Sequence, residues 1–385
     1  MRHGKQACGR IRWFHLPWAL SVVCTAFPPA RLLADAPATQ PAADDVVWSS
    51  PDIDTTPIGN VVFHGPFSNE TVNISRDNLP PHQYLEISFD FLAIRTLDGS
   101  VPMVENRPIP LGPDFFRLGI LKGPTLFYTT FSNRPDDPGF RVESKFQNYP
   151  SQVPGEHLPP QTGARDKNTL GYLYPWAGAP KPFPCDATYA VDFIVPHSDS
   201  KAVVQLTGMN LQNIIDESWS IANFKVQALS ADQVKQSSTD DIAAAFEDSL
   251  KNDSDALPRD FQTLISGMDA TADWIDAHVK PMPIDAQAAA RLVVDLAADD
   301  TQIARRDAAF TALVAVGPQI EPYLRDVRNV SVGTMRQRLD WLLQDVSDTQ
   351  ISDDDVRRVM LATRALEIIG TPRALQVRRQ LTQQQ

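Results

Sequence analysis

The sequence predicts a chain of two parts, an antiparallel β-sandwich or jelly roll over residues 46–229 and an α-helical domain over residues 259–385. Short segments with alternating apolar residues fill the first part, and this is the pattern of half-buried strands. In the second part the apolar period changes to 3.6 residues, as in amphipathic helices. The 32 prolines concentrate in the first half, where loops and irregular strands are therefore expected.

At least eight strand-like segments lie between residues 46 and 229, separated by breakers such as NLPPH and LDGS. Their number and spacing are typical of a sandwich or jelly roll. The segment YLEISFDFLAI shows the pattern most clearly, because four apolar residues share one face of the strand: Leu85, Ile87, Phe89 and Phe91. Glu86, Ser88 and Asp90 share the other face, so this strand should bury one side only.

A long insertion rich in Pro, Gly and Asn runs from Ser132 to Tyr174. Its aromatic residues argue against disorder, and we expect it to cover an open sheet edge or rim. The alternative is a sugar-binding site, in which aromatic rings stack on the sugar and amides bind its hydroxyls. The residues of that site would be Asn148, Tyr149, Asn168, Tyr172, Tyr174 and Trp176.

Residues 1–34 have the features of an export signal, with a positive start, the apolar stretch FHLPWALSVVCTAF and a small-residue cleavage point after Ala34. A disordered spacer rich in Ala and Pro is expected over residues 35–45. The alternative is a retained anchor. Only Cys185 of the three cysteines would remain after cleavage, so core burial rather than disulfides must hold the fold. The expected location is periplasmic, at the cell surface or secreted.

A polar linker with a short helix is expected over residues 230–258. In the helical domain that follows, residues 303–317 and 356–370 match at an offset of 53 residues. Arg305 then matches Arg358, and Gly317 matches Gly370. Such a repeat predicts stacked helices that bury one another's apolar stripes.

Residues 60–227 resemble a jelly-roll domain of exported bacterial proteins with a lectin-like or concanavalin-like sandwich. The resemblance is carried, in order, by GPFSNETVNISRDNLPPHQYLEISFDF, LDGS, GPD, GPTLFYTTFSN, QNYP, TGARDKNTLGY and DESWSIANFKV. The chain departs from the family pattern at Leu97, where the family has tryptophan, and at Ala222, where it has aspartate. The helical half is similar to HEAT-like repeats in DDTQIARRDAAFTALVAVG and DVRRVMLATRALEIIGTPRAL, and this similarity implies surfaces that bind other proteins.

The sequence contains no motif of nucleophilic, metalloprotease or nucleotide chemistry. The nearest pair of carboxylates is Glu86 and Asp90, which lie four residues apart on one strand face. Two such groups can divide the acid and nucleophile roles of a glycoside hydrolase. Acids on an exposed strand face are usually only solvated. We therefore favour a protein that is not an enzyme, with a carbohydrate-active sandwich as the alternative.

Calcium is the metal that the acids of the first half would favour, because it binds carboxylate, amide and carbonyl oxygens gathered from loops. The alternative is that these acids pair with Arg95 or Arg117 at the surface. The proposed ligands are Asn69, Glu70, Asp98, Asp216 and Glu217, with Asp90 and Asp114 as further candidates. No other cofactor is indicated.

The stretch IIDESWSIANFKVQAL, residues 214–229, places Asp216 and Glu217 just before a strand. The apolar phase of that strand changes at Ala222 and Asn223, which predicts a β-bulge that lets both apolar sets face inward. Trp219 should lie in the core with its indole N–H bonded. The motif is thus expected to be chiefly structural.

The net charge of −12 and the pI near 5.0 argue against a nucleic-acid partner, since phosphate binding needs a basic face. After residue 34 no segment reaches the roughly 18 apolar residues of a membrane span. The expected function is therefore an exported binding or scaffold protein. The sandwich would recognise a ligand or surface, with a polysaccharide as the alternative ligand, and the helical repeats would bind a protein partner.

Overall fold

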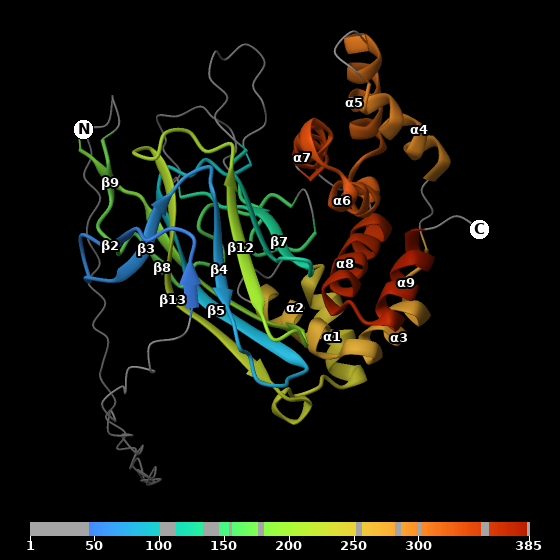
Figure 1. The fold of residues 1–385 in the computed structure, drawn as a ribbon, viewed down its shortest axis with the longest axis horizontal. Helices are drawn as coiled ribbons and strands as arrows, with labels where there is room; N and C mark the ends of the chain where they lie inside the picture. The colour runs from blue at the N-terminus through green and yellow to red at the C-terminus, as the bar shows by residue number, and fades with distance from the viewer. Residues whose placement is uncertain are drawn as a thin grey trace, which may run out of the picture. The chain divides into compact units, whose positions relative to one another are not determined.

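A computed structural model of the chain describes the following residues: 46–100, 113–133, 146–153, 156–175, 181–251, 256–281, 286–298, 302–347 and 354–382. The predicted signal peptide (1–34) and spacer (35–45) lie outside this part of the chain. The described residues form antiparallel sheets followed by a helical region (Figure 1). This confirms the predicted order of a β part and an α part at the level of sheets and helices.

Two antiparallel sheets make up most of the first half. One has the order β1-β4-β12-β6-β7 and the other the order β2-β3-β13-β5-β11-β8, and β9 pairs with β10 separately. The strands are β1 (Val46–Trp48), β2 (Ile53–Thr55), β3 (Val62–Phe67), β4 (Thr71–Arg76), β5 (Tyr84–Arg95), β6 (Phe115–Ile120), β7 (Thr125–Thr130), β8 (Asp166–Lys167), β9 (Leu173–Tyr174), β10 (Phe183–Pro184), β11 (Asp186–Pro196), β12 (Ala202–Met209) and β13 (Glu217–Leu229).

The inner faces of the two large sheets contribute to one apolar core. On β5 the predicted burial of one face is confirmed, because Leu85, Ile87, Phe89 and Phe91 are all buried in that core. The expectation that this strand buries one side only is wrong for its second half, where Asp90, Leu92 and Ile94 on the opposite face are buried too, because a separate apolar cluster covers that face. Residues of β4, β6 and β12 join them from the other sheet, including Ile74, Leu118 and Leu206. The alternating pattern of the sequence therefore located the core correctly.

The predicted bulge in β13 is confirmed. The register between β13 and β5 shifts between Ala222 and Lys225, and Asn223 has a left-handed backbone with φ of 53°. Trp219 is fully buried before the shift, and its Nε1 donates to the carbonyl of Ser68 at 2.7 Å. Val226 is buried after the shift, so both apolar phases of the strand do reach the core.

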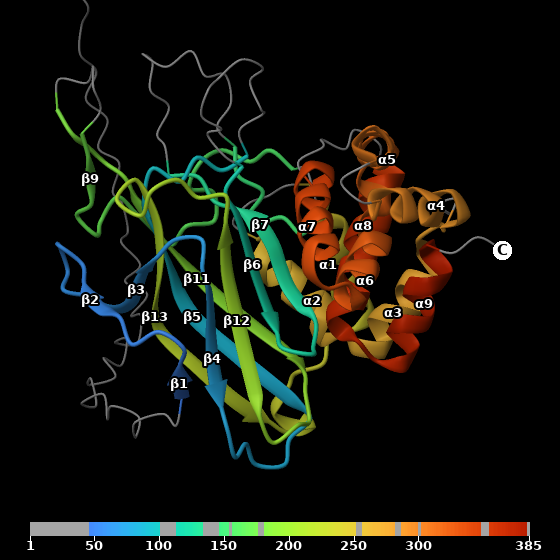
Figure 2. The same cartoon turned by 45° about the horizontal axis from the view of Figure 1, so that its top comes forward.

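The helical region lies beside the sheets (Figure 2). Its helices are α1 (Thr239–Ser249), α2 (Leu257–Ser266), α3 (Met268–His278), α4 (Ala286–Leu296), α5 (Ile303–Val316), α6 (Glu321–Val330), α7 (Gly333–Ser347), α8 (Asp354–Ile369) and α9 (Pro372–Thr382), with short 3-10 turns at Ala231–Gln233 and Pro318–Ile320.

The helices nearest the sheets share the core of the strands. Both α2 and α8 contact β11, and the same apolar cluster runs from the strands into α1, α2, α3, α8 and α9. The segment expected as a polar linker contains α1, which buries Ile242, Ala245 and Phe246 in this cluster. Sheets and helices between residues 44 and 385 thus form one compact unit.

The two segments that match at an offset of 53 residues are both helical, as α5 and α8. They belong to different apolar clusters: α5 packs with α4 and α7, whereas α8 packs with α2, α3 and α9. The buried residues differ accordingly, since α5 buries only Ala309 and Leu313 while most of α8 is buried. The HEAT-like arrangement stays a prediction.

Candidate ligand-binding cavity

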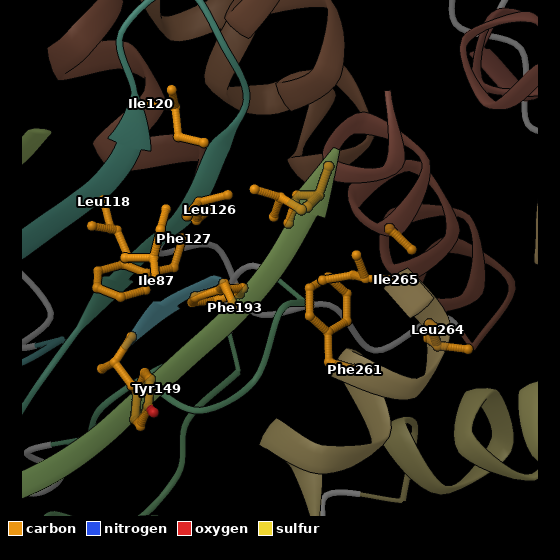
Figure 3. Packing of buried hydrophobic residues seen from close by; sticks show 14 of the residues in the cluster. Ile87, Leu118, Ile120, Leu126, Phe127, Tyr149, Phe193, Phe261, Leu264 and Ile265 are labelled. Atoms are coloured by element: carbon orange, nitrogen blue, oxygen red, sulfur yellow. The ribbon is translucent and has the colours of Figure 1, made fainter. Parts of the chain in front are cut away.

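A cavity of about 610 Å³ lies between the second half of β11 and the helices α1 and α2. This volume is within the range of roughly 300–1,000 Å³ that is usual for ligand pockets. Its apolar wall comes from Phe193 on β11 and Phe261 on α2, which belong to the same buried apolar cluster and are labelled in Figure 3. The ring of Tyr149 reaches the same cavity from the long insertion.

The backbone of β11 forms one side of this cavity. In an antiparallel pair, alternate residues direct their N–H and C=O groups toward the partner strand or away from it. The carbonyl of Thr188 accepts from the Arg165 N–H at 2.8 Å, and the Ile194 N–H donates to Gln262 Oε1 at 3.2 Å. The backbone N–H and C=O groups of residues 188 and 194 therefore point away from β5. The alternation of the strand gives Ala190 and Asp192, which lie between them, the same backbone direction.

Ala190 and Asp192 form a short open sheet edge. Both residues are exposed and line the cavity. Across the described ranges, no hydrogen bond is formed by their outward N–H and C=O groups. We call this segment, residues 190–192, the open edge. It is bounded on one side by the β8 pairing and on the other by Gln262 of α2.

Acidic side chains outnumber basic ones around the cavity. The basic residues are Lys235 and Arg259, and the acidic ones are Asp192, Asp241, Asp248 and Asp260. Of these acidic residues, Asp192 is the one that belongs to the open edge. Partial burial, together with the nearby carboxylate of Glu86, raises its pKa. A cationic group bound beside Asp192 would offset the repulsion between the carboxylates of Asp192 and Glu86.

The residues predicted for sugar binding do not gather in one place. Asn148 and Tyr149 lie near the cavity, but Asn148 Nδ2 donates to the carbonyl of Val153 at 2.8 Å and Tyr149 is only 5% exposed. The other residues lie elsewhere: Asn168 accepts from Gln161, Tyr172 lies under the Arg95 guanidinium and Tyr174 is in the small β9–β10 sheet. Trp176 lies outside the described residues. The sugar site stays a prediction.

Glu86 and Asp90 share the outer face of β5, as predicted. The carboxylate of Asp90 is held by two hydrogen bonds from Arg165, at 2.7 and 3.2 Å, and by one from Asn223 Nδ2 at 2.7 Å. It is therefore a buried ion-pair partner rather than a free nucleophile. This geometry gives the glycoside hydrolase alternative no support beyond the spacing of the two acids.

The proposed calcium ligands lie at one end of the sheets, but most are used in local contacts. Asn69 binds the backbone of Leu211 through both its amide atoms, and Glu70 accepts from the Ser68 N–H. Asp216 accepts from the hydroxyl of Thr96. Within the described residues, no three His, Cys, Asp or Glu side chains are placed to hold one metal ion. The calcium assignment therefore stays a prediction.

Asp98 and Glu217 do lie close together, deep in the protein. Gln212 bridges them, since its N–H donates to Glu217 Oε2 at 2.6 Å and its Nε2 lies 3.4 Å from Asp98 Oδ2. Burial, and then the charges of Asp114 and Asp98, raise the pKa of Glu217 to about 10. These causes favour the neutral form of the Glu217 carboxyl group.

We expect Glu217 to make the protein less stable as the pH rises. Its pKa in the folded state lies above the ordinary value of 4.5, so the folded protein holds a proton that the unfolded chain releases between pH 4.5 and about 10. The contribution is fully present below pH 4.5 and falls by up to about 1.4 kcal/mol per pH unit above it. The Glu217→Gln variant should be less sensitive to pH and more stable than the wild type at pH 8. Urea unfolding between pH 5 and 8 measures this, and parallel curves for the two proteins would contradict it.

Comparison of the chain with protein family models, with curated proteins and with solved structures finds no match. In the part of the chain that the structure describes, none of the helices has the length and apolar character that crossing a membrane requires.

The open edge was not predicted from the sequence. The segment ATYAVDFIV indicates a strand, but nothing in it shows that one side of residues 190–192 lacks a neighbouring strand. The open edge begins where the pairing with β8 ends and stops where Gln262 bonds to Ile194. These two partners lie in the long insertion and in α2. A strand edge of this kind becomes visible only once the pairing partners are known.

Proposed function

We propose that this protein is a non-enzymatic binding protein that takes an extended, basic peptide segment along the open edge of β11. The observation that carries this proposal is the pair of outward-facing backbone residues, Ala190 and Asp192, beside a cavity of about 610 Å³. An added strand would satisfy the N–H and C=O groups of both residues.

The size of the opening limits the ligand to a short segment. Thr188 and Ile194, whose outward groups are already bonded, are six residues apart, which corresponds to about 20 Å along a strand. About three to five peptide residues fit between these two points. Phe193 and Phe261 line the cavity but are largely buried, so the backbone of β11 should supply most of the contacts with the bound segment.

The charge of the cavity favours a basic ligand. Asp192 and Asp260 lie on opposite walls, on β11 and α2. Asp260 pairs with Arg259 and Asp248 with Lys251, whereas Asp192 forms no ion pair within the described residues. A Lys or Arg side chain in the ligand would pair with Asp192.

A carbohydrate ligand is the alternative, and the residues of this cavity support it less. Sugar sites present an exposed ring face for stacking, but the Tyr149 ring is buried against Phe131 and Tyr189, with centroid distances of 4.7 and 5.2 Å. The other aromatic residues of the cavity, Phe193 and Phe261, are also buried.

We expect the Ala190→Pro variant to lose peptide binding. Proline removes the outward N–H of residue 190 and leaves the ladder between β11 and β5 intact, because residue 190 does not bond to β5. Ala190→Thr is the matched control, since it adds side-chain volume but keeps the N–H. Isothermal titration calorimetry with a library of short basic, acidic and neutral peptides measures the affinities of both variants and of the wild type.

The proposal predicts binding of basic peptides to the wild type and Ala190→Thr, and at least a tenfold loss in Ala190→Pro. Asp192→Asn should weaken binding and reduce its dependence on salt. Binding of oligosaccharides that is equal in all variants would support the carbohydrate alternative instead. The absence of any peptide binding by the wild type would overturn the proposal.

The order of the strands and the arrangement of the helices are a second part of the proposal. We infer a jelly-roll order for the strands and HEAT-like repeats for the helices, with a protein partner on the helical surface. Trp341 on α7 supports such a surface, because it is 57% exposed and lines a groove of about 360 Å³ together with Phe310. Peptide binding that survives Ala190→Pro but is lost in Trp341→Ala would show that the peptide binds in this groove and not at the open edge.

A further inference from the structure

A second, much smaller pocket lies where β6 and β7 meet the helices α6 and α7. It has a volume of about 20 Å³, room for roughly one water-sized body. Its lining is strongly basic for a protein whose net charge is −12. The residues around it are Arg117, Thr125, Tyr128, Arg325, Arg328, Asn329, Asp340 and Leu343.

Arg117 and Tyr128 form the sheet side of this pocket. They are direct cross-strand neighbours on β6 and β7, on the face that points away from the core of the sheets. None of the carboxylates in the described residues forms an ion pair with Arg117. The hydroxyl oxygen of Tyr128 is buried, and it too has no hydrogen-bond partner.

The two arginines on the helix side of the pocket are already bonded to carboxylates. Arg325 bonds to Glu321 through Nε at 2.6 Å, and its guanidinium lies 5.3 Å from the centroid of the Tyr128 ring. Arg328 bonds to Asp340 through Nε at 2.7 Å. Each of these two arginines therefore has its own carboxylate, and the charge of Arg117 remains in excess.

The surroundings of Arg117 oppose its charge. Burial lowers the pKa of its guanidinium to about 10, and the charges of Arg328 and Arg336 act in the same direction, partly offset by Asp340. Arg117 is still a cation at pH 7. Burial also raises the pKa of Tyr128, so its hydroxyl keeps its proton and remains a donor. A half-buried cation without its own ion pair is costly, and an anion at this point would offset that cost.

We propose that this pocket binds one small monatomic anion, of the chloride type, between Arg117 and the hydroxyl of Tyr128. The side chains of Arg328 and Asn329 lie on its rim and can add further donors. Because the donors come from two strands and a helix, the anion would tie the outer face of β6 and β7 to α6. This site is independent of the open edge on β11.

The test compares thermal unfolding in sodium gluconate with unfolding in sodium chloride and in sodium phosphate, all at the same ionic strength and pH. Gluconate and phosphate are too large for the pocket, so the melting temperature of the wild type should rise with the logarithm of the chloride concentration only. Calorimetric titration with sodium chloride should show one site per chain. Phosphate serves as a second, larger control anion.

Two variants and one control complete the experiment. Arg117→Met should be at least as stable as the wild type in gluconate and should not respond to chloride. Tyr128→Phe should fold normally and bind the anion about five- to tenfold more weakly, because it loses one hydrogen bond. Arg373→Gln changes an exposed arginine paired with Asp273 and Asp276, so it should keep the full response.

Equal melting temperatures in gluconate, chloride and phosphate would overturn the proposal, and so would an Arg117→Met variant that responds like the wild type. If Arg117→Met does not fold, Tyr128→Phe decides the question. An unchanged anion affinity in Tyr128→Phe would then show that the pocket is not the site.

Discussion

Replacing Glu321 with glutamine should lower the free energy of unfolding by about 3–5 kcal/mol, because the change leaves a buried cation without its carboxylate. Glu321 is 2% exposed and Arg325, its partner one turn later in α6, is 8% exposed. The Nε of Arg325 donates to Glu321 Oε1 at 2.6 Å. Glu367 on α8 also stabilises the charge of Arg325, so the loss should fall short of that for a fully isolated charge.

Urea unfolding at pH 7 measures this loss, and an exposed ion pair provides the matched control. Lys251 and Asp248 are 2.8 Å apart, but both side chains are largely in solvent. Asp248→Asn should therefore cost less than about 1 kcal/mol. A similarly small loss in Glu321→Gln would show that water reaches the Arg325 guanidinium and that the interface between α6 and the sheet is open.

Adding a single methyl group at Gly208 should cost about 3 kcal/mol, because β12 has no room for a side chain there. A Cβ on Gly208 would lie 2.6 Å from Nε1 of Trp219 and would overlap the carbonyl oxygen of Ser68. These two groups form the hydrogen bond that fixes the buried indole. Gly208→Ala should therefore break this bond and displace Trp219.

Thermal unfolding gives the loss of stability, and the near-ultraviolet circular dichroism of the tryptophans reports the displacement. Gly119→Ala on β6 is the control, since its nearest contacts would be 3.1 and 3.3 Å away, where a small shift suffices. It should cost clearly less than Gly208→Ala. Equal losses, or an unchanged tryptophan signal in Gly208→Ala, would contradict the tight approach of β12 to Trp219.

The strand cores were predictable because alternation is a local property of the chain. In β5 each apolar residue of the predicted face is buried. The bulge in β13 was predictable for the same reason, since the change of phase at Ala222 and Asn223 is visible in the sequence and needs an extra residue in the strand.

The packing between sheet and helices was less predictable. Residues 230–258 are rich in polar residues, which indicated a linker. However, three apolar residues at helical spacing, Ile242, Ala245 and Phe246, are enough to bury one face of α1. Composition averages over both faces of a helix, so it does not reveal a narrow apolar stripe when the opposite face is strongly polar.

The candidate sites were the hardest to predict, because they depend on which groups are already bonded. Asn69 has the chemistry of a calcium ligand, but its amide is used by the backbone of Leu211, 142 residues away. Conversely, Arg117 appeared to be a partner for surface acids, and the fold places it beside Arg328 instead. Such pairings join residues that are distant in sequence and are determined only by the fold.

Amide hydrogen exchange at Ala190 and Asp192, followed by NMR, tests the central claim most directly. Their outward N–H groups should exchange rapidly in the free protein, while those of the neighbouring Val191 and Phe193, which face β5, should exchange slowly. A basic peptide that adds a strand should slow exchange at Ala190 and Asp192. Slow exchange at both residues in the free protein, or rapid exchange that the peptides leave unchanged, would contradict an open, ligand-binding edge on β11.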